Sequence, residues 1–403
     1  MAGRTGGSVS RYLRQEVVPH SAYYRDRLGP ALASAEPRGQ EELYRLPFTR
    51  LDEVDDPTEL VLRPDWAGGR PRGRRETQRG AVERAYKPIH WVLQAGMAVG
   101  YSAADLEVLA GLGARWLGLA GLGPDDILVS ILPPGPHLGW WQLALGARQA
   151  GISALHLPPV PSAEAVAAFY PSVLAGRPFD LARLLDEGRA RGHLLDDVDT
   201  LLVVGELLEP TMRARLTALL PDPDAAVVSA WAPPGVRALW GQCRYADAYH
   251  TWPDTEVVEI VDPLSGEPAP PGADGEVVWT AVGWRGTVLV RLRTGEFALP
   301  EEGVCPACGT PSRRLSVSPS TPAFLAALDQ HAGVAGWQAE LRRAGMDEEL
   351  VVFLVPTPGS SLGPLLADLD AELSAVQYVV VDVAALDARI AAHGDRRVVD
   401  LRA

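Results

Sequence analysis

Three cysteines and one histidine have the residue types and the spacing of a metal site. Cys305 and Cys308 form a Cys-Pro-Ala-Cys turn, a spacing at which two thiolates reach one tetrahedral ion. Cys243 stands seven residues before His250, and this pair would complete a Cys3His set. A closed four-ligand set leaves no position for a substrate, so the site would be structural. The alternative is three buried thiols and a surface histidine; a redox role is disfavoured, because this CxxC does not open a helix after a strand.

The composition is that of an ordinary globular protein. The 403 residues are 47% hydrophobic and 22% charged, enough for one large domain with a satellite or for two to three ordinary domains. Thirty-seven basic and 51 acidic residues give a net charge of −14, which argues against a nucleic-acid or anionic-membrane binder. Residues 1–20 contain no signal-peptide core, and no apolar run reaches about 18 residues, so a cytoplasmic protein is expected.

Short apolar runs alternate with amphipathic segments in the middle of the chain. This alternation predicts parallel strands covered by helices on both faces of a sheet. Residues 1–45 are predicted to be helical as far as Gly29-Pro30, and the Gly/Arg-rich segment 64–80 is predicted to be a loop because it lacks a hydrophobic period. The four predicted strands lie within residues 125–134, 153–160, 199–208 and 225–233.

The pattern changes near residue 250. Two β-branched runs flank a long Pro/Gly turn, which predicts an antiparallel β module over about 241–314. The last part of the chain, 322–403, alternates helix and strand and predicts a small α+β domain. We therefore predict an α/β fold with a large N-terminal domain at 1–314, which combines a layered α/β region with the β module, a linker at 315–321 and the small C-terminal domain.

The order of several segments resembles the phenylacetate–CoA ligase family of adenylate-forming enzymes. Val-Val-Gly-Glu-Leu-Leu-Glu-Pro, with Gly205 and Glu206, is similar to the Gly-x-Glu-Pro type turn of that family. Arg-Leu-Arg-Thr-Gly-Glu resembles its Arg-Tyr-Arg-Thr-Gly-Asp strand, and Cys-Pro-Ala-Cys-Gly-Thr its Cys-rich turn. The match extends in order over nearly the whole chain. It implies the family fold, and it implies structural zinc as the ion held by the Cys3His set.

The resemblance also implies a two-step reaction. ATP with Mg²⁺ and a carboxylic acid would form an acyl-adenylate, and the thiol of CoA would then displace AMP. The implied nucleotide contacts are Gly205, Glu206, Trp231, Thr294 and Glu296. Trp231 could stack on a base or an aryl group, or belong to the core. His137 and Trp140 would line the acyl pocket; the alternative is a helix packing face with an exposed histidine.

Three parts that this chemistry needs are altered in the sequence. The segment 67–80, at the position of a hydroxyl-rich phosphate loop, is rich in arginine and offers a single hydroxyl, that of Thr77. Phosphate binding by arginines and a solvated loop are both open here. Ala232 and Pro233 stand where the family has Thr-Glu, and neither supplies the hard oxygen ligand that Mg²⁺ requires. Glu296 replaces the ribose-binding aspartate, the mildest of the changes.

The C-terminal lysine of the family is absent as well. Asp395, Arg396 and Arg397 occupy its region, and Lys87 is the only lysine in the chain. Arginine is a planar fork instead of a compact ammonium, and losing such a contact typically costs roughly a hundredfold or more in rate. The linker also lacks the Gly-Arg-x-Asp hinge, so domain rotation is unsupported.

We therefore predict an acyl- or aryl-CoA-ligase-like protein with impaired or altered catalysis, acting on a small carboxylic acid or its thioester. The alternative is a non-catalytic relative that binds an acyl or nucleotide ligand, or a protein partner, in the same cleft. A third hypothesis is ATP-independent acyl chemistry. No nucleic-acid or membrane partner is expected, and a homodimer is compatible with the sequence.

Overall fold

An 11-stranded mixed sheet dominates the computed structural model. Its strand order is β10-β11-β12-β13-β9-β8-β7-β6-β5-β3-β4. The structure describes residues 9–33, 43–54, 56–64, 74–94, 96–158, 161–192, 194–220, 222, 224–318, 325–344, 347–373, 376–393 and 396–401. The strands of this sheet are β3 (Ile127–Ser130), β4 (Ser153–His156), β5 (Val173–Gly176), β6 (Thr200–Val204), β7 (Ala226–Trp231), β8 (Trp240–Cys243), β9 (Ala246–His250), β10 (Glu256–Val261), β11 (Gly275–Ala281), β12 (Leu292–Glu301) and β13 (Arg314–Val317).

The five strands from β3 to β7 are parallel and covered on both faces, as predicted. Alternating side chains along a strand enter different cores: Leu128 packs with the cluster under α6 and α7, and Val129 with the cluster under α8 to α10. The sequence analysis missed β5, because a run of four small apolar residues resembles a loop as much as a strand. The covering helices are α6 (Ala103–Leu119), α7 (Leu138–Ala150), α8 (Ala163–Ala167), α9 (Pro178–Ala190) and α10 (Pro210–Leu219).

The antiparallel module continues the same sheet. Strand β8 pairs antiparallel with β7, joining Ala230 to Gly241 and Trp231 to Trp240. Strands β9, β13, β12, β11 and β10 then follow in antiparallel pairs. The ladder of backbone hydrogen bonds is therefore continuous from the parallel strands to the far edge of the module.

The N-terminal segments differ from the expectation at two places. Helix α3 contains Pro30 instead of ending at it. Helix α5 begins at Arg74, inside the segment 64–80 predicted as a loop. Arg, Glu and Gln are good helix formers, so this polar helix forms without the hydrophobic period that the sequence search required. The elements here are η1 (Leu13–Val17), α2 (Val18–His20), α3 (Ala22–Ala33), η2 (Leu51–Glu53), η3 (Pro57–Leu60), α5 (Arg74–Tyr86), β1 (His90–Gln94) and β2 (Met97–Tyr101).

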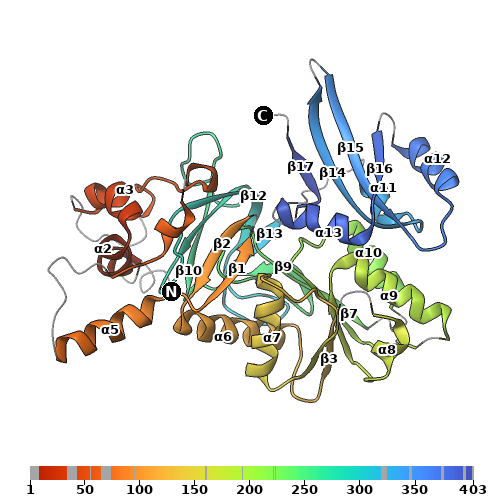
Figure 1. Cartoon of the computed structure of the whole chain (residues 1–403), viewed down its shortest axis with the longest axis horizontal. Coiled ribbons are helices and arrows are strands. Elements are labelled where there is room, and N and C mark those ends of the chain that lie inside the picture. The colour runs from red at the N-terminus through yellow and green to blue at the C-terminus, as the bar shows by residue number, and fades with distance from the viewer. Residues whose placement is uncertain are drawn as a thin grey trace.

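A separate four-stranded sheet, of order β16-β15-β14-β17, forms the C-terminal unit at the upper right of Figure 1. Leucines of α11 and α12 pack on one face of it, and Leu386 and Ile390 of α13 on the other. The division into domains stays a prediction; part of the linker expected at 315–321 lies in β13, and the rest extends beyond the described residues. The elements are α11 (Ala326–Gln330), β14 (Val334–Ala344), β15 (Asp347–Pro356), α12 (Leu362–Glu372), β16 (Val376–Val380), α13 (Val383–Ala392) and β17 (Val398–Asp400).

Helices α6 and α7 cross in backbone contact at Gly113 and Gly146. A Cβ on Gly146 would lie 2.6 Å from the carbonyl carbon of Gly113 and 2.7 Å from its Cα. We expect Gly146→Ala to lower the free energy of unfolding by about 2–3 kcal/mol, because neither backbone can yield without moving a helix. Gly111→Ala is the matched control: its Cβ meets nothing within 4 Å, so the variant should be neutral or gain up to about 1 kcal/mol. Urea denaturation measures both, and equal stabilities would contradict the close crossing.

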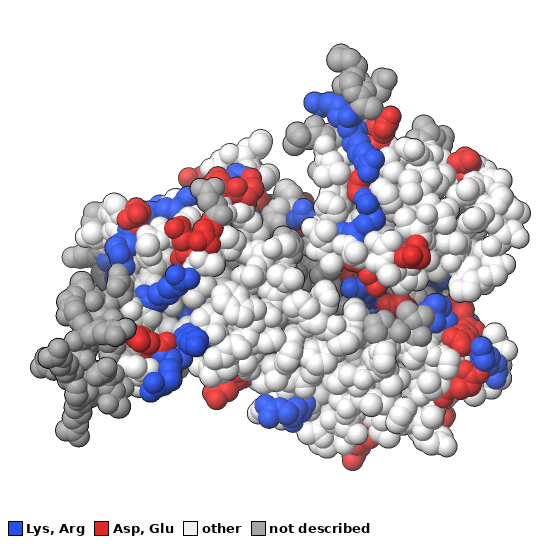
Figure 2. Space-filling model, in the orientation of Figure 1, with Lys and Arg blue, Asp and Glu red and all other residues white. Residues whose placement is uncertain are grey.

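Among the described residues, no helix combines the length and apolarity needed to cross a membrane. On the face shown in Figure 2, basic and acidic side chains of the described residues lie interspersed over both units.

Candidate functional site

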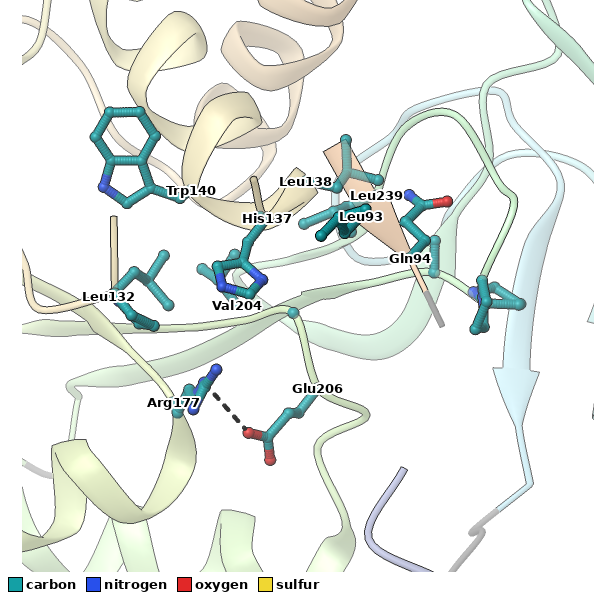
Figure 3. Close-up of a pocket in the computed structure, with 16 residues that line it drawn as sticks. Leu93, Gln94, Leu132, His137, Leu138, Trp140, Arg177, Val204, Glu206 and Leu239 are labelled. Atoms are coloured by element: carbon teal, nitrogen blue, oxygen red, sulfur yellow. Dashed lines mark ion pairs between the residues drawn. The ribbon is translucent and has the colours of Figure 1, made fainter. Parts of the chain in front are cut away.

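A pocket opens at the carboxyl ends of the parallel strands, where α/β sheets bind ligands. In this conformation its volume is about 50 Å³. Strand β6 leads into it through Gly205, whose φ of +93° favours glycine. Most of the wall is apolar, with polar groups from His137, Arg177, Glu206 and Gln94 (Figure 3). The lining residues are Leu93, Gln94, Leu132, Pro133, His137, Leu138, Gly139, Trp140, Arg177, Val204, Gly205, Glu206, Ala232, Pro233, Pro234 and Leu239.

Four of the residues expected at the site meet in this pocket. Gly205 and Glu206 follow β6, and His137 and Trp140 lie at the start of α7. The ring of Trp140 lies 5.2 Å from that of His156 and 4.9 Å from that of Trp141, so its orientation is fixed by neighbouring aromatic rings. Burial lowers the pKa of His137, and nearby Arg177 lowers it further. The imidazole is therefore neutral at pH 7 and able to accept a proton.

The sequence analysis missed Arg177. It is the residue directly after β5 and lies at the N-cap of α9, so it projects from the carboxyl end of a central strand. Its Nε lies 3.8 Å from Oε1 of Glu206, and the two side chains point toward each other below His137 (Figure 3). A charged residue directly after an apolar run was the available signal, and it was overlooked because β5 was not recognised as a strand.

The other expected nucleotide residues lie outside this pocket. Trp231 is 6% exposed and belongs to the main core, with its ring 6.1 Å from those of Trp240 and Tyr249. The hydroxyl of Thr294 donates to the carbonyl of Val277 at 2.7 Å, so it supports the strand pairing. In this structure Trp231 is therefore packed in the core, which was the alternative to stacking on a base or an aryl group.

Two adjacent arginines of the C-terminal unit, Arg396 and Arg397, lie close to Glu296 and Glu206. Arg396 Nη2 lies 3.0 Å from Oε1 of Glu296, a carboxylate whose pKa is raised by burial and lowered in part by this arginine. Arg397 Nη1 donates to Oδ1 of Asp329 at 2.5 Å, and its Nε lies 4.0 Å from Oε2 of Glu206. Glu206 and Glu296, the two carboxylates expected to contact a nucleotide, therefore both have cationic partners from the C-terminal unit.

A wider hollow of about 620 Å³ lies beside the Gly205–Glu206 turn, between α10 and the strands β8, β9 and β13. Glu209 and Tyr249 line it, and Arg213 crosses it to within 3.4 Å of Asp247. Its volume falls in the range of small-molecule and cofactor sites, whereas the first pocket has room only for a very small group.

The four expected metal ligands are brought together at the opposite end of β8. Cys243 ends β8, His250 ends β9, and Cys305 and Cys308 lie on the turn between β12 and β13. All four ligand atoms lie within 4.8 Å of one another. Sγ of Cys308 is 3.6 Å from Nε2 of His250, a separation that suits two ligands of one tetrahedral ion with bonds of about 2.0–2.3 Å.

The surroundings of this cluster suit metal binding. Backbone hydrogen bonds from Gly309 N to Cys305 O and from Cys305 N to Thr310 O, each 2.9 Å, hold the turn closed. Nδ1 of His250 is 2.7 Å from Oγ of Ser312, which leaves Nε2 facing the thiols. Burial, and then Arg314, lower the pKa of His250 to about 4, so the imidazole is in its neutral, metal-binding form at pH 7. The donor set therefore fits zinc.

Comparisons with known proteins agree with this architecture. No family model matches the chain. The phenylacetate-coenzyme A ligase of Thermus thermophilus is 27% identical over 288 residues, which is 68% of this chain and 59% of that protein. The enzyme of the same name from Aromatoleum evansii is 27% identical over 209 residues, 49% of this chain and 46% of the relative. The chain thus spans about half the length of these curated relatives.

Solved structures of 2-hydroxyisobutyryl-CoA ligase share the fold over the whole chain. The enzyme in its postadenylation state, with a bound acyl-AMP, superposes with a TM-score of 0.68 at 18% identity, covering 99% of this chain and 88% of that one. Its thioesterification state, with acyl-AMP and CoA, gives a TM-score of 0.63 at 18% identity, covering 100% and 90%. In sequence the chain is therefore similar to phenylacetate-coenzyme A ligases, and its fold is the one that it shares with 2-hydroxyisobutyryl-CoA ligase.

Proposed function

We propose that the cleft binds a small carboxylic acid and an adenine nucleotide, and that the protein is an acid–CoA ligase-like protein with altered nucleotide handling. The observation that carries this proposal is the convergence of Gly205, Glu206, His137 and Trp140 on one pocket at the carboxyl ends of the parallel strands. The named activity of the relatives, CoA ligation of an acid, is consistent with it. CoA would be the acceptor in a second step.

The acid and the nucleotide would occupy different volumes. The narrow pocket offers an apolar wall and the polar groups of His137 and Arg177 to the acid. The nucleotide would lie at the Gly205–Glu206 turn and extend into the wider hollow that begins at Leu207, whose volume is that of a cofactor site. In such a complex the neutral imidazole of His137 would donate a hydrogen bond from its N–H to the carboxylate of the acid, while Trp140 and its aromatic neighbours would exclude water from the apolar wall.

The residues present do not fit a Mg²⁺ site of the expected kind. Ala232 and Pro233 line the pocket and supply no side-chain oxygen. Glu206 is 5% exposed and faces both Arg177 and Arg397. This arrangement favours the second candidate function, a non-catalytic relative that binds an acyl or nucleotide ligand or a protein partner in the same cleft.

Carboxylate-dependent ATP–pyrophosphate exchange separates the two candidates. With a panel of alkyl and aryl acids, the ligase proposal expects exchange above background for at least one acid, at a rate roughly a hundredfold or more below that of an enzyme with an intact lysine. His137→Ala should lower the acid-dependent rate, whereas Leu264→Ala, at a 96% exposed position in the turn between β10 and β11, should leave it unchanged. No exchange with any acid, together with no thermal stabilisation by ATP–Mg²⁺, would reject the ligase proposal in favour of the non-catalytic one.

We also propose that the Cys3His cluster holds one structural zinc ion. A cytoplasmic location, a homodimer and a protein partner stay predictions from the sequence.

A further inference from the structure

The guanidinium of Arg177 is the cationic group of the acid pocket. Only 12% of its side chain is exposed, and it lines the pocket together with the apolar residues Leu132, Trp140 and Val204. A guanidinium beside an apolar wall is suited to a carboxylate, since its planar fork can donate two parallel hydrogen bonds while the wall takes the apolar part of the acid.

In this structure Arg177 already binds a carboxylate, that of Asp387. Asp387 lies on α13 of the C-terminal unit, and its carboxylate pairs with Nη1 of Arg177. The second acidic neighbour, Glu206, is more loosely placed, with its Oε1 3.8 Å from Nε of Arg177. Asp387 thus supplies, from within the chain, the same chemical group as the acid that the pocket is proposed to bind.

The Arg177–Asp387 pair is placed so that another carboxylate can exchange with it. The side chain of Asp387 is 36% exposed, so the carboxylate regains much of its hydration when it leaves the arginine. Arg177 cannot do the same, because it stays in the half-enclosed pocket. Asp180 lies close enough to interact with Arg177 and Asp387; burial raises its pKa to about 6, so it is still mostly ionised at pH 7.5 and adds to the negative charge near Arg177.

The docking of the C-terminal unit does not depend on this pair alone. The hydroxyl of Thr211 on α10 donates to Oδ2 of Asp329 at 2.7 Å, and Arg215 donates to the carbonyls of Asp329 and Val334 at 3.1 and 3.3 Å. These contacts involve neither Arg177 nor Asp387. Asp387 can therefore leave Arg177 while the unit keeps its other contacts.

We propose that Arg177 binds the carboxylate of the acid ligand, and that Asp387 is an internal competitor which the ligand displaces. This inference rests on the proposed function. It names the residue that would bind the carboxylate of the acid, and a contact within the chain that would regulate this binding. Ligand binding would release α13 from the rim of the pocket, and contacts that hold α13 in place would weaken acid binding. A competing internal carboxylate lowers the apparent affinity by the fraction of molecules in which it occupies the arginine.

Calorimetric titration of the full chain at pH 7.5 tests the proposal, with acetate, butyrate and phenylacetate as probes and with their amides as uncharged matches. Asp387→Asn should tighten acid binding roughly 3- to 10-fold and leave amide binding unchanged. Arg177→Gln should weaken acid binding about tenfold or more and abolish the preference for acid over amide. Thr211→Val loosens the same interface away from the pocket and should leave acid binding as in the wild type.

Three outcomes would overturn the inference. These are unchanged acid affinity in Arg177→Gln, no tightening in Asp387→Asn, or equal tightening in Asp387→Asn and Thr211→Val, which would indicate general loosening of the interface. Absence of acid binding to Asp387→Asn, where no competitor is left, also counts against it. The proposed function is judged separately. Acid-selective binding without ATP–pyrophosphate exchange would support this inference and reject adenylation. Exchange together with acid binding that does not depend on Arg177 would support adenylation and reject this inference.

Discussion

Cys305→Ser is expected to abolish stoichiometric zinc binding and to lower the free energy of unfolding by roughly 5 kcal/mol or more. The reason is that structural zinc contributes on the order of 10 kcal/mol to the stability of small domains. Cys305 is 1% exposed and lies within ligand distance of two other strand ends. Without the ion, two strand ends and one turn lose their common anchor, and a buried hydroxyl takes the place of a ligand. Metal analysis by mass spectrometry and thermal unfolding measure the two effects.

Ser312→Ala is the matched control for this variant. It removes the hydroxyl beside Nδ1 of His250 but leaves all four donor atoms in place. Its zinc affinity should fall by about 10- to 100-fold, as is usual for groups that orient a ligand, while the purified protein still carries the ion. A metal-free wild-type protein that is as stable as the zinc-loaded one would contradict the zinc site.

Arg397→Gln is expected to lower the free energy of unfolding by about 3–5 kcal/mol, the usual penalty for removing one partner of a buried ion pair. Arg397 is 5% and Asp329 0% exposed, and the guanidinium also lies 5.2 Å from the ring of Trp337 and 5.4 Å from that of Phe179. The variant leaves the carboxylate of Asp329 buried with hydrogen bonds only from neutral groups among its described partners, Thr211 and Trp337.

The neighbouring residue provides the comparison. Arg396 pairs with Glu296, but its side chain is 43% exposed, so Arg396→Gln should cost less than about 1 kcal/mol. In both variants, hydrogen exchange of the backbone amides in β14 and β17, measured at increasing urea concentration, reports the stability of the C-terminal unit. Equal losses in the two would show that burial does not set the strength of these pairs.

The metal cluster could be predicted because its signal is local. A CxxC turn fixes two ligands within four residues, and the remaining cysteine and histidine are few enough to be assigned without the fold. The structure added the reason why they meet: Cys243 and His250 end neighbouring strands, and β13, which follows the CxxC turn, pairs with β9. The Gly205–Glu206 turn was recognisable through its resemblance to the Gly-x-Glu-Pro turn of the family, and it directly follows the apolar run 201–204.

The contacts between the two units could not be predicted in the same way. Arg177 and Asp387 are 210 positions apart, and no periodicity or spacing connects them. Whether an exposed-looking arginine pairs with a given carboxylate depends on how two separately folded sheets dock, and that docking is encoded in packing instead of local pattern. The polar helix α5 escaped notice for a different reason, because its helical propensity is carried by charged residues that leave no apolar stripe.

The continuity of the large sheet links two places that the sequence treats as unrelated. Strand β8 has Leu239, a wall residue of the pocket, directly before its first residue and Cys243, of the Cys3His cluster, as its last. Four residues of extended chain are only about 14 Å long, and this strand is hydrogen-bonded to β7, which leads into Ala232 and Pro233 beside Leu239. The Cys3His cluster and the pocket therefore lie at the two ends of one short strand, so that a distortion at the cluster would be transmitted along the backbone to the shape of the pocket.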